Sequence, residues 1–141
     1  MNELKNEIQG GELFGAIKDS IQDARNVVQQ LAHSFQDNVR SLRMDGDDSA
    51  FKELTQNIGD LDSLLKYIKE LGDGVNCLDG MGLPPDPITA QGFGINLFRE
   101  MHTAIEVKDW IMLSDLIEYE LAPLLGKEDE WLGSLDEKLK T

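Results

Sequence analysis

Apolar side chains recur every seven residues along the first part of the chain, in two rows three residues apart. This heptad pattern is typical of a long helix that packs one face against a neighbouring helix. It predicts a helix from about Leu13 to Met44. The first row contains Phe14, Ile21, Val28, Phe35 and Leu42, and the second contains Ile17, Ala24 and Leu31.

A second heptad pattern predicts a helix from about Ser49 to Leu71. Gly46 would end the first helix, and Asp47, Asp48 or Ser49 would cap the second by accepting a free backbone N–H. A short polar turn between two such helices indicates an antiparallel hairpin over residues 13–71. We expect the centre of the core where the rows meet, at Ile21, Val28, Leu31, Phe35, Ile58, Leu61 and Leu65.

Asn38 continues the second row of the first helix as its polar member. A lone polar residue in an apolar seam can fix the register or the oligomeric state of the helices that meet there. The alternative is that Asn38 lies beyond the packed part of the helix. The helix is also longer than its predicted partner, which favours a homodimer slightly.

Glycine and proline interrupt residues 72–94, and both disfavour a long regular helix. The sequence predicts a long connection here, with at most a turn of helix over residues 75–79. The residues responsible are Gly72, Gly74, Gly80, Gly82, Pro84, Pro85, Pro87, Gly92 and Gly94.

The C-terminal part predicts a second helical hairpin and a tail over residues 95–141. Its first helix runs from near Ile95 to Val107, and Asp109 caps the next one. Pro123 should kink or end that helix, because proline lacks the backbone donor and clashes with the preceding turn. The sequence therefore predicts one all-α domain over residues 1–141, a four-helix bundle of two hairpins behind a flexible segment 1–12. A short final helix would place Leu132, Leu135 and Leu139 on one side.

The formal net charge is −14 and the pI is about 4.3. This charge argues against binding to nucleic acid and to anionic membranes, since both need clustered Lys and Arg. The N-terminus lacks the apolar core of a secretory signal, and no stretch reaches the roughly 20 apolar residues that span a bilayer. We therefore expect a cytoplasmic protein.

Known catalytic and metal-binding motifs do not fit this chain, so we expect a non-enzymatic protein with no catalytic residue, cofactor or metal. A di-metal bundle needs Glu-x-x-His, but Gln30 precedes His33 and Arg99 precedes His102 at that spacing. The acidic residues 45–48 do not follow the EF-hand pattern. The single cysteine, Cys77, has no basic neighbour in the sequence that would activate it.

Residues 109–137 contain nine acidic side chains and one basic one, Lys127. Aromatic residues are common anchors of interfaces, and an acidic rim speeds encounter with a basic partner. The hypothesis is that this region binds a basic or amphipathic helix of another protein, with Trp131 as its anchor. The alternative is that both tryptophans are core residues and the acids only solvate their helices. The candidate residues are Trp131, Glu128, Asp129, Glu130, Tyr119 and Glu118.

The second hypothesis is a small-molecule- or metal-responsive bundle, including a minor enzymatic activity. A pocket lined jointly by Cys77, His102, Tyr119 and Glu118 would favour it. An apolar groove with an acidic rim would favour protein interaction instead.

The segment 108–125 contains the run Asp-x-x-Glu-Tyr-Glu-Leu-x-Pro-Leu-Leu and resembles a segment of small uncharacterised bacterial helical-bundle proteins. This resemblance implies two helical hairpins and no particular activity. The acidic composition and the Lys-Asp turn are also similar, at fold level, to flagellin-export chaperones, although their N-terminal Asn-Pro-Tyr motif is missing. That similarity concerns the fold and does not establish a function. From the sequence as a whole we expect a protein that mediates protein–protein interaction, as an adaptor, a regulator or an export-chaperone-like protein.

Overall fold

Every regular element that the computed structural model describes is helical, which confirms the all-α class. The structure describes the backbone of residues 2–44, 47–79 and 84–139 and the side chains of residues 15–44, 47–75, 84–90 and 92–139. The elements in chain order are α1 (Asn2–Met44), α2 (Asp48–Asp79), the 3₁₀ turn η1 (Ala90–Gly92), α3 (Phe93–Glu106), α4 (Trp110–Leu116), the π-helical turn η2 (Ile117–Leu121) and α5 (Ala122–Leu139).

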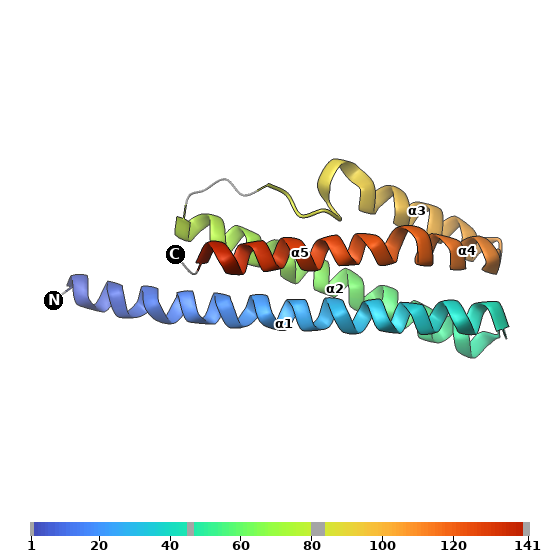
Figure 1. Ribbon diagram of the computed structural model, residues 1–141, viewed down its shortest axis with the longest axis horizontal. Coiled ribbons are helices and arrows are strands. Elements are labelled where there is room, and N and C mark those ends of the chain that lie inside the picture. Colours follow the sequence, from blue (N-terminus) through green and yellow to red (C-terminus); the bar gives the residue numbers. More distant parts are fainter. Residues whose placement is uncertain (1, 45–46, 80–83, 140–141) are drawn as a thin grey trace.

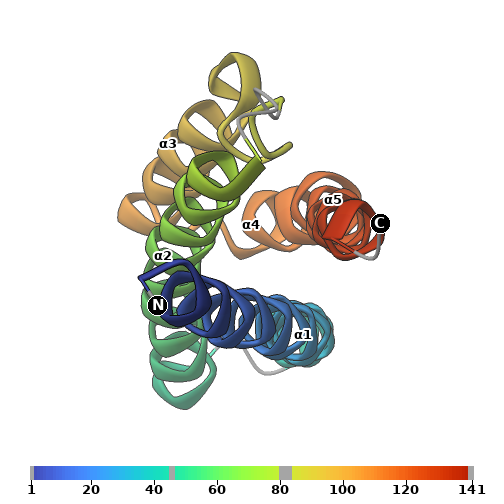
Figure 2. The same ribbon diagram turned by 90° about the vertical axis from the view of Figure 1, so that its left-hand side faces the viewer.

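The long helix α1 packs along α2 on one side and along α5 on the other (Figure 1). The elements α4, η2 and α5 follow one another without a break, and α3 packs against α4. In the view along the length of the molecule, α1, α2 and α5 lie at three different positions around its centre (Figure 2). The core therefore draws side chains from all of the long helices.

The core residues follow the heptad rows. Ile21, Val28, Leu31, Phe35 and Leu61 are buried, and Ile58 and Leu65 are partly buried against them, which confirms the predicted centre of the core. The row predicted for the C-terminal tail is also buried, and it contains Leu132, Leu135 and Leu139.

Two predicted helix caps are present. Oδ1 of Asp47 accepts a hydrogen bond from the backbone N–H of Ala50 at 2.9 Å, and Oδ1 of Asp109 accepts one from Met112 at 3.0 Å. Each cap satisfies a backbone donor that the first turn of a helix leaves free. Gly46, predicted to end α1, lies outside the described residues.

The first two helices are longer than predicted. α1 begins at Asn2, so residues 2–12 are helical where the sequence predicted a flexible segment. α2 continues through Gly72 and Gly74 to Asp79, which corrects the predicted start of the connection at residue 72. Val75 is fully buried, and burial of a valine stabilises by about 1.5–3 kcal/mol, which offsets the roughly 2 kcal/mol cost of two helical glycines.

Pro123 and Gly126 do not end the last helix, which runs on to Leu139 as α5. The prediction of a separate short final helix was therefore wrong. The distortion expected at Pro123 lies directly before it, in η2, where the backbone N–H of Ala122 bonds to the carbonyl of Ile117. This wider turn gives space to the proline ring, which would clash with the preceding turn of a regular α-helix.

Candidate functional site

Exposed apolar side chains gather in the segment from α3 to η2. Among the described residues, six of the nine large hydrophobic side chains that are exposed belong to residues 93–119. Scattered exposed apolar residues are ordinary on a folded protein, whereas their concentration in one segment makes that segment a candidate interaction surface. The six are Phe93, Ile95, Val107, Ile111, Met112 and Tyr119.

Two hollows in this surface share Tyr119 and Glu120 in their linings. The first has a volume of about 480 Å³ and is lined on its apolar side by Ile111, Met112 and Leu116. The second has a volume of about 300 Å³, and its apolar lining includes Phe93, Leu97 and Leu124. Because both hollows contain the same two residues, we treat them as one site and call it the Tyr119 groove.

Tyr119 lies in the middle of the π-helical turn η2. Helical residues four positions apart share a face, and the residue midway between them lies on the opposite face. Ile117 and Leu121 at its two ends are buried, whereas Tyr119 between them is 69% exposed. The turn thus presents an aromatic side chain to solvent from a helix whose other face remains in the core.

The charged residues that line the groove are mostly acidic. Asp109 and Asp115 line the first hollow, Glu100 the second, and Glu120 both, while Lys127 is the basic residue among them. An acidic rim around an apolar floor attracts a basic partner.

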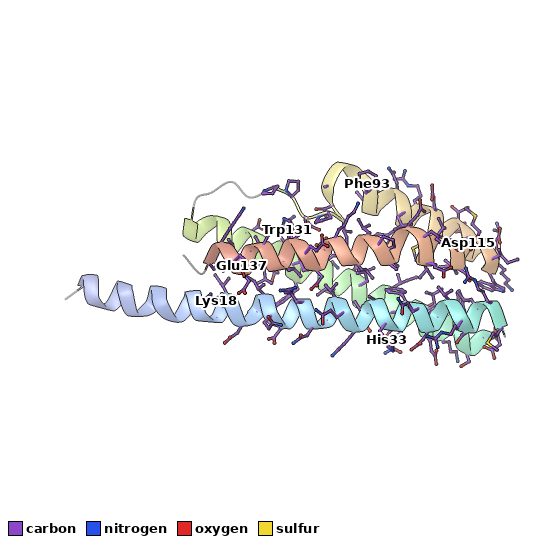
Figure 3. All side chains as sticks on the ribbon, viewed as in Figure 1. Lys18, His33, Phe93, Asp115, Trp131 and Glu137 are labelled. Carbon is purple, nitrogen blue, oxygen red and sulfur yellow. The ribbon has the colours of Figure 1, made fainter. Side chains whose placement is uncertain are left out.

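Asp115 is partly neutralised from outside the groove. It lies on α4 (Figure 3), and Arg43 at the end of α1 bonds to it at 3.1 Å and to Glu118 at 2.6 Å. These two contacts show that Asp115 and Glu118 share a face of the helix. The hydrogen bond from Arg43 to Glu118 is the main cause of a raised pKa of the guanidinium. Among the described residues, the acidic side chains of the rim that form no ion pair are Glu100, Glu120 and Asp109, and Asp109 also caps α4 through Oδ1.

A second polar cluster lies away from the groove, where residues 84–92 cross α5. Glu128 of α5 is fully buried, and its Oε2 accepts a hydrogen bond from the backbone N–H of Ile88 at 3.1 Å. Asp86 is 9% exposed, and it accepts a hydrogen bond from the hydroxyl of Thr89. Burial, and next the hydrogen bond with Asp86, raise the pKa of Glu128 to about 9. Glu128 is therefore protonated at neutral pH.

Residues 19–128 match a family model described as Domain of unknown function (DUF8042). The chain belongs to this family. The DUF8042 match includes the whole Tyr119 groove as well as Asp86 and Glu128. No curated protein and no solved structure matches the chain.

The structure does not bring the six candidate residues from the sequence together. Within the DUF8042 match, Tyr119 lines the groove, Glu118 pairs with Arg43, and Glu128 is buried, so the predicted acidic rim at residues 128–130 is corrected. Beyond the match, Asp129 forms an ion pair with Arg25 at 3.0 Å, and Glu130 is exposed.

Trp131, predicted to anchor a partner, makes an intramolecular contact. It is partly buried on α5, on the side of the preceding segment 84–92 (Figure 3), and its indole Nε1 donates a hydrogen bond to the carbonyl of Pro84 at 3.2 Å. The indole therefore holds a part of the same chain, and the exposed aromatic residue of the region is Tyr119.

The pocket that would favour a ligand-responsive bundle is not present in the described part of the DUF8042 chain. The side chain of Cys77 lies outside the described residues. His102 is exposed and pairs with Glu106 at 3.0 Å, and neither hollow that contains Tyr119 is lined by His102 or Glu118. The described residues contain no group of three His, Cys, Asp or Glu side chains placed to hold a metal ion. None of the helices in residues 2–44, 47–79 and 84–139 has the length and apolar character needed to cross a membrane.

Sequence reasoning missed Phe93, Ile111 and Met112. A signal was available for the last two, because the buried stripe of this helix contains Trp110, Leu113 and Leu116 at helical spacing. Ile111 and Met112 fall outside that stripe. The helix therefore carries more apolar side chains than its buried face can cover.

Proposed function

We propose that this protein is a non-catalytic interaction module that binds a basic amphipathic helix of another protein in the Tyr119 groove. The observation that carries the proposal is the joining of two apolar hollows at Tyr119 under a mainly acidic rim. We infer that the scaffold is a four-helix bundle of two hairpins, α1 with α2 and α3 with the continuous segment α4–η2–α5.

A helix is the partner that suits the shape and chemistry of the groove. An amphipathic helix binds by placing its apolar face in a groove, with anchors three or four residues apart. Phe93, Met112 and Tyr119 offer apolar and aromatic contacts for such anchors. Lys and Arg on the flanks of the partner would pair with Glu100, Glu120 and Asp109. The net charge of −14 would speed encounter with this partner and oppose binding of a second copy in the groove.

This chemistry suits an adaptor, a regulator or an export-chaperone-like protein, because each of these holds a helical segment without changing it covalently. The rival function, a small-molecule- or metal-responsive bundle, gains no support from the described positions of His102, Tyr119 and Glu118.

The test uses a labelled synthetic peptide with an apolar face of Leu and a polar face of Arg, and fluorescence anisotropy as the measurement. Tyr119→Ala should weaken binding by about tenfold or more, because truncation of an aromatic anchor commonly costs upward of about 1–2 kcal/mol. Tyr67→Ala is the matched control, since Tyr67 is also an exposed tyrosine on a helix but lines a different hollow, between α1 and α2.

A scrambled peptide of the same composition separates recognition of a helix from general attraction between opposite charges. It keeps every Arg and loses the apolar face, so we expect weak binding that salt abolishes. Equal binding of the two peptides, or equal effects of Tyr119→Ala and Tyr67→Ala, would show that the groove is not the binding site.

A further inference from the structure

Residues 84–92, which we call the strap, run along α5 to the start of α3 (Figure 1). Two side chains of α5, three residues apart and thus on one face, hold the strap. Trp131 donates to the carbonyl of Pro84 at 3.2 Å, and Glu128 accepts from the N–H of Ile88 at 3.1 Å. The side chain of Ile88 is buried in the core.

The strap is tied equally closely to the first turn of α3. The backbone N–H of Gly94 donates to the carbonyl of Ile88 at 2.7 Å. A Cβ at position 94 would lie only 2.4 Å from that carbonyl oxygen, so only glycine permits this approach. Gly92 also has a left-handed backbone, with φ of 74°. Because Phe93 lies between these two glycines, the position of the strap sets the position of one wall of the Tyr119 groove.

The surroundings of the second carboxyl oxygen of Glu128 indicate which interaction keeps the strap in place. Oε1 is buried and has no hydrogen-bond partner among the described groups, and the carboxyl of Asp86 is close enough to Glu128 to raise its pKa. Ionised carboxylates only accept hydrogen bonds, so two of them side by side repel each other and leave this oxygen unsatisfied. A proton on Glu128 removes both problems, because its O–H then donates to Asp86.

Other charged groups of α1, α2 and α5 lie near the pair. Lys69 and Asp73 of α2 line a hollow of about 330 Å³ together with Asp86 and Trp131. Arg25 of α1 bonds to Asp129, the neighbour of Glu128 on α5. The described structure shows no hydrogen bond from either cation to Oε1 of Glu128.

We propose that a proton shared within the Asp86–Glu128 carboxyl pair keeps the strap closed, and that loss of this proton releases the strap and displaces Phe93 from the Tyr119 groove. The first half concerns the strap alone. The second half rests on the proposed function, since it predicts a change in the groove as a binding site.

The test follows two resonances by NMR while the pH is raised from about 6 to about 10, a range that spans the expected titration. One is the carboxyl carbon of Glu128 and the other is a methyl group of Ile88, assigned with Ile88→Val. We expect both to change with one midpoint near pH 9, because the buried Ile88 methyl moves into solvent when the pair loses its proton.

Two variants replace the proton by a permanent donor. The amide of Glu128→Gln can accept from Ile88 N–H and donate to Asp86, and the amide of Asp86→Asn can donate to an ionised Glu128. Either variant should keep the Ile88 methyl unchanged to pH 10. Glu130→Gln is the matched control: it removes one carboxyl from an exposed position two residues away and should behave as the wild type does.

The strap half of the proposal is overturned if Glu128 titrates while the Ile88 methyl stays unchanged, or if both amide variants open as the wild type does. The groove half is tested with the arginine-bearing peptide, which keeps its charge over this range. We expect wild-type affinity to fall by about tenfold on opening and Glu128→Gln to retain it. If the strap opens without a change in affinity, the carboxyl pair still controls the strap, but the proposed link between the strap and the groove is overturned.

Discussion

The side-chain amide of Asn57 on α2 donates a 2.6 Å hydrogen bond to Oδ1 of Asn38 on α1. Asn38 is 2% exposed, so it lies inside the packed seam and not beyond it. A polar pair in an apolar seam favours one register, because a shift of either helix would place each amide against apolar side chains. The hydrogen bond between Asn38 and Asn57 thus favours one register of α1 against α2.

Removal of one partner of this pair should be costly. Asn38→Ala leaves the amide of Asn57 without its acceptor in a partly buried site, and we expect a loss of about 1–3 kcal/mol in the free energy of unfolding. Urea denaturation of Asn38→Ala, Asn57→Ala and the double variant measures the pairwise energy. Strictly additive losses would show that the hydrogen bond contributes nothing.

Leu61 tests the centre of the core. It is 1% exposed, and Leu61→Ala should reduce the free energy of unfolding by about 2–5 kcal/mol through lost burial and the remaining cavity. Met44→Ala is the control, since Met44 is 81% exposed and its truncation should cost less than about 0.5 kcal/mol. Similar losses in the two variants, measured by denaturant titration, would place Leu61 outside the core.

The helices and their core could be predicted because heptad spacing reports burial directly. Ile21, Phe35 and Leu61 of these rows are buried as predicted, and the caps at Asp47 and Asp109 follow from local chemistry. Local chemistry was a poor guide where tertiary contacts outweigh it. α2 passes Gly72 because Val75 beyond it is buried, and the distortion caused by Pro123 is absorbed by one wider turn.

The candidate site was harder to predict because it depends on contacts between distant segments. Glu128 belongs to an acidic run in the sequence, and such side chains are usually solvated. It is buried because residues of the strap, 40 positions earlier in the chain, close over it and supply the N–H of Ile88. Tyr119 was a candidate from the sequence, but the second of its two hollows arises only where α3 meets η2 and the start of α5.

Lys108 offers a stabilising substitution. It ends α3 with a left-handed backbone, φ of 57°, and the bonds from Lys108 N–H to Ile105 and from Asp109 N–H to Ala104 form a Schellman motif. This conformation costs a side-chain-bearing residue about 1 kcal/mol, and glycine adopts it freely. We expect Lys108→Gly to raise the free energy of unfolding by roughly 0.5–1 kcal/mol. Lys127→Gly, a glycine within α5, should lower it; a loss in both variants would contradict the assignment.

The free energy of unfolding should fall as the pH rises toward 9, because the pKa of Glu128 is raised in the folded protein. Its pKa is raised from an ordinary 4.5 to about 9 in the folded protein. Between these values the folded state holds a proton that the unfolded state has lost, so the free energy of unfolding decreases with pH by at most about 1.4 kcal/mol per unit. The contribution is complete below pH 4.5 and is lost as the pH passes through about 9. Local opening of the strap limits the total loss, because the carboxylate regains water before the whole domain unfolds.

Glu128→Gln isolates this contribution. The amide does not titrate, so the free energy of unfolding of this variant should be nearly flat from about pH 6 to about pH 9, whereas that of the wild type declines. The exposed histidines, His33 and His102, are present in both proteins and cancel in the difference. Urea denaturation at several pH values measures the two slopes, with Glu130→Gln as the control for removal of one negative charge. Parallel slopes for the wild type and Glu128→Gln would mean that Glu128 titrates alike in the folded and unfolded chains, and a steeper slope in the variant would reverse the sign argued here.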